Sequence, residues 1–524
     1  MAYSRDDLVS VASEAAYGAF YLFSGQTLAT LIAALASIVV ARLLGPELYG
    51  VYSLCLVVPG FLLLFTDFGV SPALTRFSAK LRAEGEYGRL ASLIRSGFIF
   101  KVFTCFITLL IGLTLSDMLA ALIINRFELA FLVRVAVFLA LFNGVYGTVN
   151  STLIGFNDMR SSASLSVVIQ LARSVLCPIL IVAGFSVLGA VLGFVLSYLL
   201  AAVLGTVIVY VNHYRGLNPR VNNAFREDLR VMLSYGLPLY FSSTLESAVG
   251  TYQGMVLAWL TSNVMVGNFR VAANFASLMS LLTGPISTAL FPAFSRLSLN
   301  SGEIRWMVKY SVKYTAAILA PASMFVIVMS RDLVSIIYGQ AYSMASDFLS
   351  LYSIVFLYAG LGSVVWGSFF QGVGWTKINL KATLIYSILL TPLTFILAKT
   401  YSVPGLIVGF LASSLASTIY SLSVALRRLH VNIDVRSILL IYFASAISAT
   451  PLLLLVAYSR LPSPINLAVG AVVFTIIYLT LMPIIGGINQ GDIENFKLMF
   501  KGVKPLKPII NIILHYEAKL AGNR

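Results

Sequence analysis

The sequence predicts an all-α integral membrane protein of about 14 transmembrane helices. We expect two parallel six-helix repeats around a central cavity, plus two C-terminal helices. Three observations predict this fold: the composition, the lengths of the apolar runs and an internal repeat. Of 524 residues, 59% are hydrophobic and only 10% are charged, and the mean hydropathy is +0.92. Because soluble globular chains carry about 25% charged residues, the composition indicates a polytopic membrane protein.

The apolar runs supply the elements in order. A helix needs about 20 mostly apolar residues to cross a membrane. Fourteen stretches meet this requirement, at residues 16–41, 49–69, 92–116, 130–154, 161–184, 187–211, 234–260, 266–290, 308–329, 348–371, 379–399, 403–425, 437–458 and 464–486. Loops connect them, and the first loop contains Gly45-Pro46, a strong turn signal.

An internal repeat relates the two halves of the chain. Residues match at a nearly constant offset of 216 or 217, in the pairs Ala41/Ala258, Leu43/Leu260, Gly50/Gly267, Tyr52/Phe269, Phe77/Phe294, Ser78/Ser295, Gly155/Gly372, Arg160/Lys377, Gly189/Gly405 and Gly193/Gly409. Each pair alone is weak, but their common order and offset indicate a duplication. Since six spans separate equivalent positions, the two halves have the same orientation, as in transporters with parallel repeats.

The repeat divides the chain into five parts. We expect an N-terminal six-helix lobe over 1–212, a cytoplasmic linker over 213–230 and a C-terminal six-helix lobe over 231–430. Helices 13 and 14 follow over 431–490, and a basic amphipathic cytoplasmic tail over 491–524. In that tail, apolar residues from Phe496 to Val503 alternate with lysines, which predicts a helix on anionic lipid or, alternatively, a solvated tail.

The distribution of basic residues predicts the orientation. Counted together with the adjoining ends of the spans, the termini and the loops after even-numbered spans carry 27 Lys and Arg, and the loops after odd-numbered spans carry 6. By the positive-inside rule, both termini lie in the cytoplasm of a multi-pass cell-membrane protein. The same bias explains the net charge of +15 without a nucleic-acid partner.

Several function classes are excluded by what the sequence lacks. It contains no phosphate-binding G-x-x-x-x-G-K-[ST] motif, and its three histidines lie far apart without a carboxylate or cysteine cluster. The three cysteines lie singly within apolar runs. We therefore predict no metal, no cofactor and no enzymatic activity, also because the loops on the outer side are short.

Polar residues inside the spans are the candidate site. Gln26 and Thr30 in the first span coincide with Ser243 and Ser247 in the seventh under the repeat offset, and both pairs share a helix face. These stripes predict a cavity between the halves, although interhelical hydrogen bonding also accounts for them. Glu246 is harder to explain this way, because a carboxylate at membrane depth is costly.

Arginines within the spans point to an anionic substrate. Arg173 lies near the middle of the fifth span, and Arg270 lies one turn into the eighth. A guanidinium binds phosphate through a bidentate fork and stays charged. A structural partner or snorkelling is the alternative for both. Asp67 and Arg76 are expected to flank the cytoplasmic end of the second span.

Residues 41–52 carry a family resemblance. The run from Ala41 to Tyr52, with Gly45, Pro46, Glu47, Tyr49 and Gly50, resembles the first-loop signature of polysaccharide-biosynthesis flippases. These belong to the multidrug/oligosaccharidyl-lipid/polysaccharide exporter superfamily. The segments 67–77, 339–342 and 372–377 resemble further elements of that family. Gln253 departs from the pattern, because many members carry an acidic residue at this position.

The resemblance implies alternating access by two rocking lobes and a lipid-linked oligosaccharide substrate of the polyprenyl or dolichyl phosphate or diphosphate type. It also implies that cavity arginines bind the phosphate. The predicted substrate-binding residues are Arg173, Arg270, Arg42, Glu246, Gln26 and Gln253. Expected partners are the lipid-linked glycan, membrane lipids and glycan assembly enzymes.

Two alternatives remain. The first is a cation-coupled small-molecule or drug antiporter of the same superfamily, whose members tend to use a carboxylate in the first span. The second is a non-transporting scaffold, which would not need charges inside the membrane.

Overall fold

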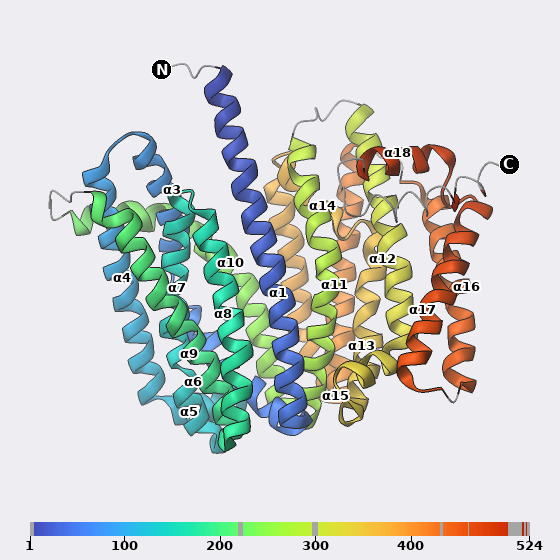
Figure 1. The fold of residues 1–524 in the computed structure, drawn as a ribbon, viewed down its shortest axis with the longest axis horizontal. Helices are drawn as coiled ribbons and strands as arrows, with labels where there is room; N and C mark the ends of the chain where they lie inside the picture. Colours follow the sequence, from blue (N-terminus) through green and yellow to red (C-terminus); the bar gives the residue numbers. More distant parts are fainter. Residues whose placement is uncertain are drawn as a thin grey trace. The chain divides into compact units, whose positions relative to one another are not determined.

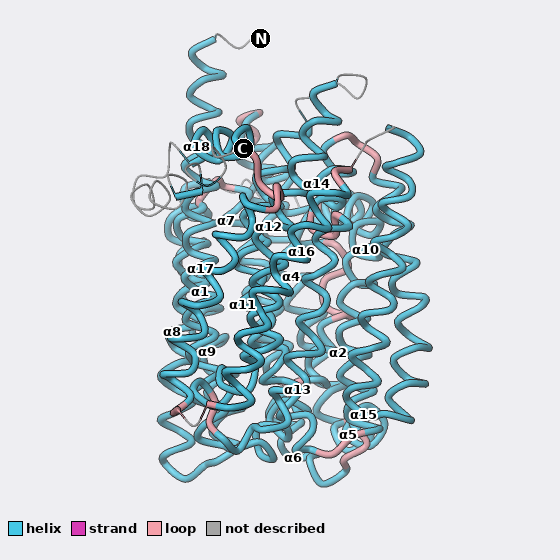
Figure 2. The backbone as a smooth tube through the Cα atoms, turned by 90° about the vertical axis from the view of Figure 1, so that its right-hand side faces the viewer, coloured by secondary structure: helices cyan, strands magenta, loops and turns pink. Residues whose placement is uncertain are grey.

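The computed structural model describes residues 5–217, 224–295, 302–429, 433–459, 461–500, 516–517 and 520. Helix is the only regular structure among them, as the cyan tube of Figure 2 shows. The chain forms two compact units, Met1–Arg270 and Val271–Arg524. The predicted all-α membrane fold is confirmed.

Unit 1 contains the first half of the helices (Figure 1). Its α-helices are α1 (Arg5–Cys55), α2 (Val57–Leu63), α3 (Val70–Ala83), α4 (Tyr87–Thr114), α5 (Ser116–Ile124), α6 (Ala130–Ala136), α7 (Phe138–Gly155), α8 (Met159–Leu180), α9 (Ser186–Ile208), α10 (Phe225–Leu260) and the start of α11 (Asn263–Ser295). Helix α1 packs on α8 and α9, and α10 packs along α2, α3, α4 and α5. Because α10 lies against these helices, it belongs to the compact unit that ends at Arg270. The predicted lobes follow the sequence repeat instead, which assigns this helix to the second lobe.

Unit 2 contains the remaining helices. They are α12 (Gly302–Ile337), η5 (Gln340–Tyr342), α13 (Ser343–Ser353), η6 (Ile354–Leu361), α14 (Val365–Gly372), α15 (Thr376–Leu429), α16 (Val435–Tyr458), α17 (Ser463–Ile484) and α18 (Gln490–Phe500). Helix α12 packs against α13, α16 and α17. Beneath α18, the Lys313 Nζ lies 2.6 Å from Asp492 Oδ2, and both side chains are at most 1% exposed. The predicted lipid contact of the tail runs from Phe496 to Val503, and the side chains of this stretch lie outside the described residues.

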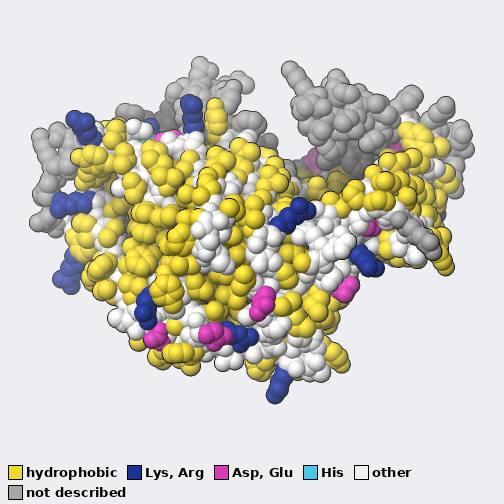
Figure 3. Space-filling view, turned by 60° about the horizontal axis from the view of Figure 1, so that its bottom comes forward, with side chains coloured by type: hydrophobic (Ala, Val, Ile, Leu, Met, Phe, Trp, Pro, Cys, Tyr) yellow, Lys and Arg dark blue, Asp and Glu magenta, His cyan; other side chains and the backbone are white. Residues whose placement is uncertain are grey.

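The number of crossing helices agrees with the prediction. Ten segments of the described chain are long and apolar enough to span a membrane. Three of these contain a turn, at Gly45, at Gly184 to Ser186 and at Ser402. Dividing them at the turns gives thirteen, and α10, which is 36 residues long but is not among those ten segments, occupies the place of the predicted seventh span. Hydrophobic side chains are the largest group on the surface drawn in Figure 3, and the few charged side chains lie mainly toward its edges, as expected for a protein surrounded by lipid.

Glycine contacts confirm the register of the repeat. A Cβ on Gly193 would lie 2.7 Å from the Cys177 backbone nitrogen, and a Cβ on Gly409 would lie 2.9 Å from that of Thr394. The two glycines are related by the repeat offset of 216, and the two residues that they contact are related by the offset of 217. In each repeat, therefore, a small residue lets two consecutive helices approach closely, which is a common device in membranes.

Candidate functional site

The first corner of the chain is where the two repeats touch. Gly45, with φ 73°, interrupts α1, and Pro46 starts the helical segment that follows. A Cβ on Gly50 would lie 1.8 Å from the Asn263 carbonyl oxygen, and a Cβ on Gly267 would lie 1.9 Å from that of Pro46. The two contacts are related by the repeat offset of 217. The corner is thus a reciprocal backbone contact between equivalent segments, and only glycine fits at its centre.

Arg173 is held by aromatic side chains in the interior of unit 1. It lies on α8, about 16 Å from the turn at Gly184 at 1.5 Å per residue. Its Nη2 donates to the Tyr52 hydroxyl over 3.3 Å, and its guanidinium lies 4.1 Å from the ring centroid of Phe194. Tyr52 belongs to the corner segment and is 2% exposed. The corner and the intramembrane arginine therefore form one site.

Two buried polar atoms at this site lack a partner among the described residues. They are Nε of Arg173 and Oε1 of Gln170. The two residues are three apart on α8, so they share a helix face. One atom is a donor and the other an acceptor, so a ligand with both kinds of group would satisfy both. Gln170 was not predicted, although its spacing from Arg173 was a signal in the sequence.

The other predicted residues occupy different positions. Arg270, half-buried on α11, lies against α10, because a Cβ on Gly254 would come within 3.7 Å of its Nη2. Gln253 is half-buried beside that glycine. Arg42 and Gln26 are exposed on α1. The side chain of Glu246 lies outside the described residues. Arg173 and Arg270 thus have different neighbours, and a shared phosphate site remains a prediction.

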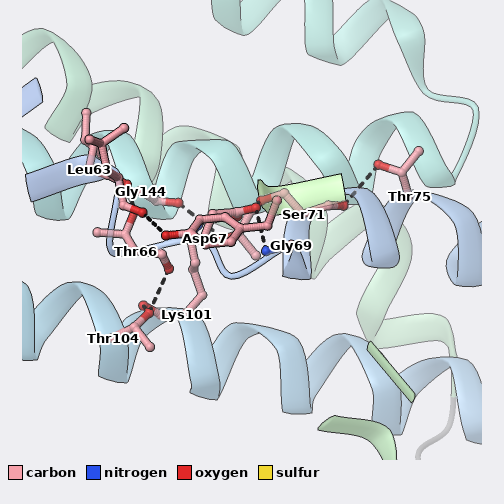
Figure 4. A network of polar contacts seen from close by, with 12 residues as sticks. Leu63, Thr66, Asp67, Gly69, Ser71, Thr75, Lys101, Thr104 and Gly144 are labelled. Atoms are coloured by element: carbon pink, nitrogen blue, oxygen red, sulfur yellow. Dashed lines mark hydrogen bonds and ion pairs between the residues drawn. The ribbon is translucent and has the colours of Figure 1, made fainter. Parts of the chain in front are cut away.

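A buried ion pair, which the sequence analysis did not predict, lies at the break between α2 and α3. After Leu63 the chain leaves the helix, and it resumes as α3 at Val70 (Figure 4). In this break, Asp67 Oδ1 lies 2.5 Å from Nζ of Lys101, whose side chain is 4% exposed. Lys101 is halfway along the 28-residue helix α4. The segment that is apolar enough to cross the membrane ends at Leu63, four residues before Asp67, so the expectation that Asp67 flanks the cytoplasmic end of the second span stays a prediction.

Side chains satisfy the backbone of this break. Thr66 Oγ1 donates to the Leu63 carbonyl over 2.9 Å, and Thr104 Oγ1 donates to the Thr66 carbonyl over 3.0 Å. Asp67 also accepts from Ser71 Oγ and, over 3.2 Å, from the Gly69 amide. Non-helical backbone at membrane depth is tolerated only where protein groups satisfy it, so this network holds the break in place.

Comparison with known proteins gives consistent results. The family model for "Polysaccharide biosynthesis protein" matches residues 15–298. The lipopolysaccharide biosynthesis protein WzxC of Escherichia coli (strain K12) is 24% identical over 196 residues, 37% of this chain and 40% of that protein. The chain thus matches well under half the length of this relative.

Two solved structures share the fold. The lipid II flippase MurJ, in an inward closed conformation, has a TM-score of 0.72 at 15% identity, covering 88% of this chain and 98% of its own. An inward-facing multidrug resistance transporter of the MATE family has a TM-score of 0.65 at 17% identity, covering 76% and 94%. By name, the first is a flippase and the second is a transporter. This agrees with the prediction that the chain is not an enzyme.

Proposed function

We propose that this chain, which belongs to the polysaccharide biosynthesis protein family within a superfamily of membrane transporters, is a flippase for a lipid-linked oligosaccharide. The sugar and its phosphate or diphosphate would cross inside the protein while the lipid tail stays in the bilayer. The proposal includes a place in the cell membrane with both termini in the cytoplasm, and glycan assembly enzymes as partners.

The environment of Arg173 carries the proposal. A guanidinium has five N–H donors, and here one nitrogen bonds to Tyr52 while the buried Nε has no partner among the described residues. Phosphate oxygens accept from guanidinium groups with good geometry. Gln170 Oε1, also without a partner, can accept from a sugar hydroxyl. A sugar phosphate offers an acceptor for Arg173 Nε and a donor for Gln170 Oε1, whereas Arg173 would repel a cationic drug.

The test is translocation of a lipid-linked sugar in proteoliposomes. Arg173→Ala should abolish translocation, and Arg173→Lys should restore little of it, because an ammonium cannot form the bidentate fork. Arg134→Ala is the matched control, since Arg134 is half exposed and pairs with Asp117 outside this site. Full translocation by Arg173→Ala would remove Arg173 from the site. Drug-stimulated cation movement without sugar translocation would favour the antiporter.

A further inference from the structure

A polar hollow lies at the end of unit 2 opposite α18. Its volume is about 520 Å³, within the range of small-molecule sites. Its walls come from the end of α12, the turn through η5 into α13, and the turn between α16 and α17. Nine of its thirteen lining residues are polar or charged, and five are serines. A hollow with this lining differs from the apolar surface around it.

Asp332 is the unusual group in this hollow. It lies near the end of α12 and is only 7% exposed. Among the described residues no hydrogen bond or ion pair holds its carboxylate, which lines the hollow. An ionised carboxylate has about four acceptor sites. The hollow therefore presents a strong acceptor to which a ligand can donate hydrogen bonds.

Contacts among the lining residues hold the two walls beside Asp332 in place. Ser459 Oγ donates to Asn466 Oδ1 over 2.5 Å, which leaves the Asn466 amide nitrogen as a donor for a ligand. On the other wall, Tyr342 is 1% exposed and anchors the turn, while Gln340 is exposed at the hollow. This turn contains residues 339–342, one of the segments that resemble elements of the flippase family, and the site around Arg173 does not include it.

The chemistry of the lining selects the ligand class. One carboxylate with an arginine, Arg331, beside it is a poor site for a metal cation, which requires several oxygen anions. The same carboxylate repels a phosphate. Hydroxyls, amides and a single carboxylate instead match a ligand whose groups both donate and accept, as the hydroxyls of a sugar do.

We propose that this hollow is a saccharide-binding site, with Asp332, Gln340 and Asn466 as its recognition groups. The proposal rests on the proposed function for its substrate class and for the orientation, which places the hollow on the outer side. On that side, the hollow would hold one sugar of the glycan as the glycan leaves the protein.

The experiment is saturation-transfer difference NMR on the full chain in detergent, with free galactose, N-acetylglucosamine and glucose as probes. At least one probe should bind. Loss of a charge-assisted hydrogen bond should weaken that binding about tenfold in Asp332→Asn. Gln340→Ala should also weaken the binding of the probe. Because the Gln340 side chain is exposed, this substitution should leave the fold intact. Asp347→Asn is the matched control, since Asp347 is exposed on α13 and does not line the hollow.

Binding of none of the three probes, or equal binding by wild type and both hollow variants, would overturn the proposal. The translocation assay separates this failure from failure of the proposed function. Sugar binding without translocation in wild type leaves the saccharide site standing and removes the flippase. Translocation without sugar binding removes only the site.

Discussion

Replacing Lys101 by methionine should destabilise unit 1 strongly. Methionine nearly preserves the length of the side chain but removes the charge that pairs with Asp67 at 2.5 Å. Breaking a buried ion pair from one side costs about 3–5 kcal/mol, because the remaining charge stays buried. Asp67 is 29% exposed and keeps hydrogen bonds from Ser71 and Gly69, so we expect a loss near 3 kcal/mol.

The assay is denaturant unfolding of the purified protein in detergent, with the midpoint compared between variants. Lys80→Met is the control, since Lys80 pairs with Glu84 at 3.7 Å with both side chains about half exposed, and such pairs contribute about 0–1 kcal/mol. The double variant Lys101→Met with Asp67→Asn should recover much of the loss. A Lys101→Met protein as stable as the Lys80→Met control would refute the reasoning.

Three further predictions concern other parts of the molecule. Gly50→Ala should reduce the yield of folded protein, because its Cβ would overlap a carbonyl oxygen, whereas Gly147→Ala, with open space around it, should fold normally by size-exclusion profile. Lys313→Met should cost about 3–5 kcal/mol in the same unfolding assay, and adding Asp492→Asn, which removes the charge but keeps an acceptor for Tyr314 and Asn489, should recover part of that loss; no recovery would contradict an ion-pair origin. Despite the cost of burial, the hydrogen bonds from His213 and the Ser161 amide hold the pKa of Asp158 below its usual range. Its contribution should therefore be complete above about pH 4 and disappear as the pH falls through that lowered pKa, so unfolding scans of wild type and Asp158→Asn should converge in acid.

The sequence was sufficient for the crossings and the repeat, because both depend on local composition and on spacing. Glycines at Gly50 and Gly267 mark positions where backbones touch, and such positions leave a residue signature. Arg173 was also visible, since one charge in an apolar run stands out.

Pairings between distant residues were not predictable in the same way. Lys101 lies in an apolar run as clearly as Arg173 does, but nothing local shows that the chain breaks after Leu63 and brings Asp67 to it. The hollow near Asp332 likewise combines residues more than a hundred positions apart.

The most direct test of the account is translocation of a lipid-linked sugar by the purified protein in vesicles, with wild type beside Arg173→Ala and Arg134→Ala. The account predicts translocation by wild type and by Arg134→Ala, and none by Arg173→Ala. Equal rates in all three proteins, or no sugar translocation by wild type in vesicles that show drug-stimulated cation movement, would contradict it.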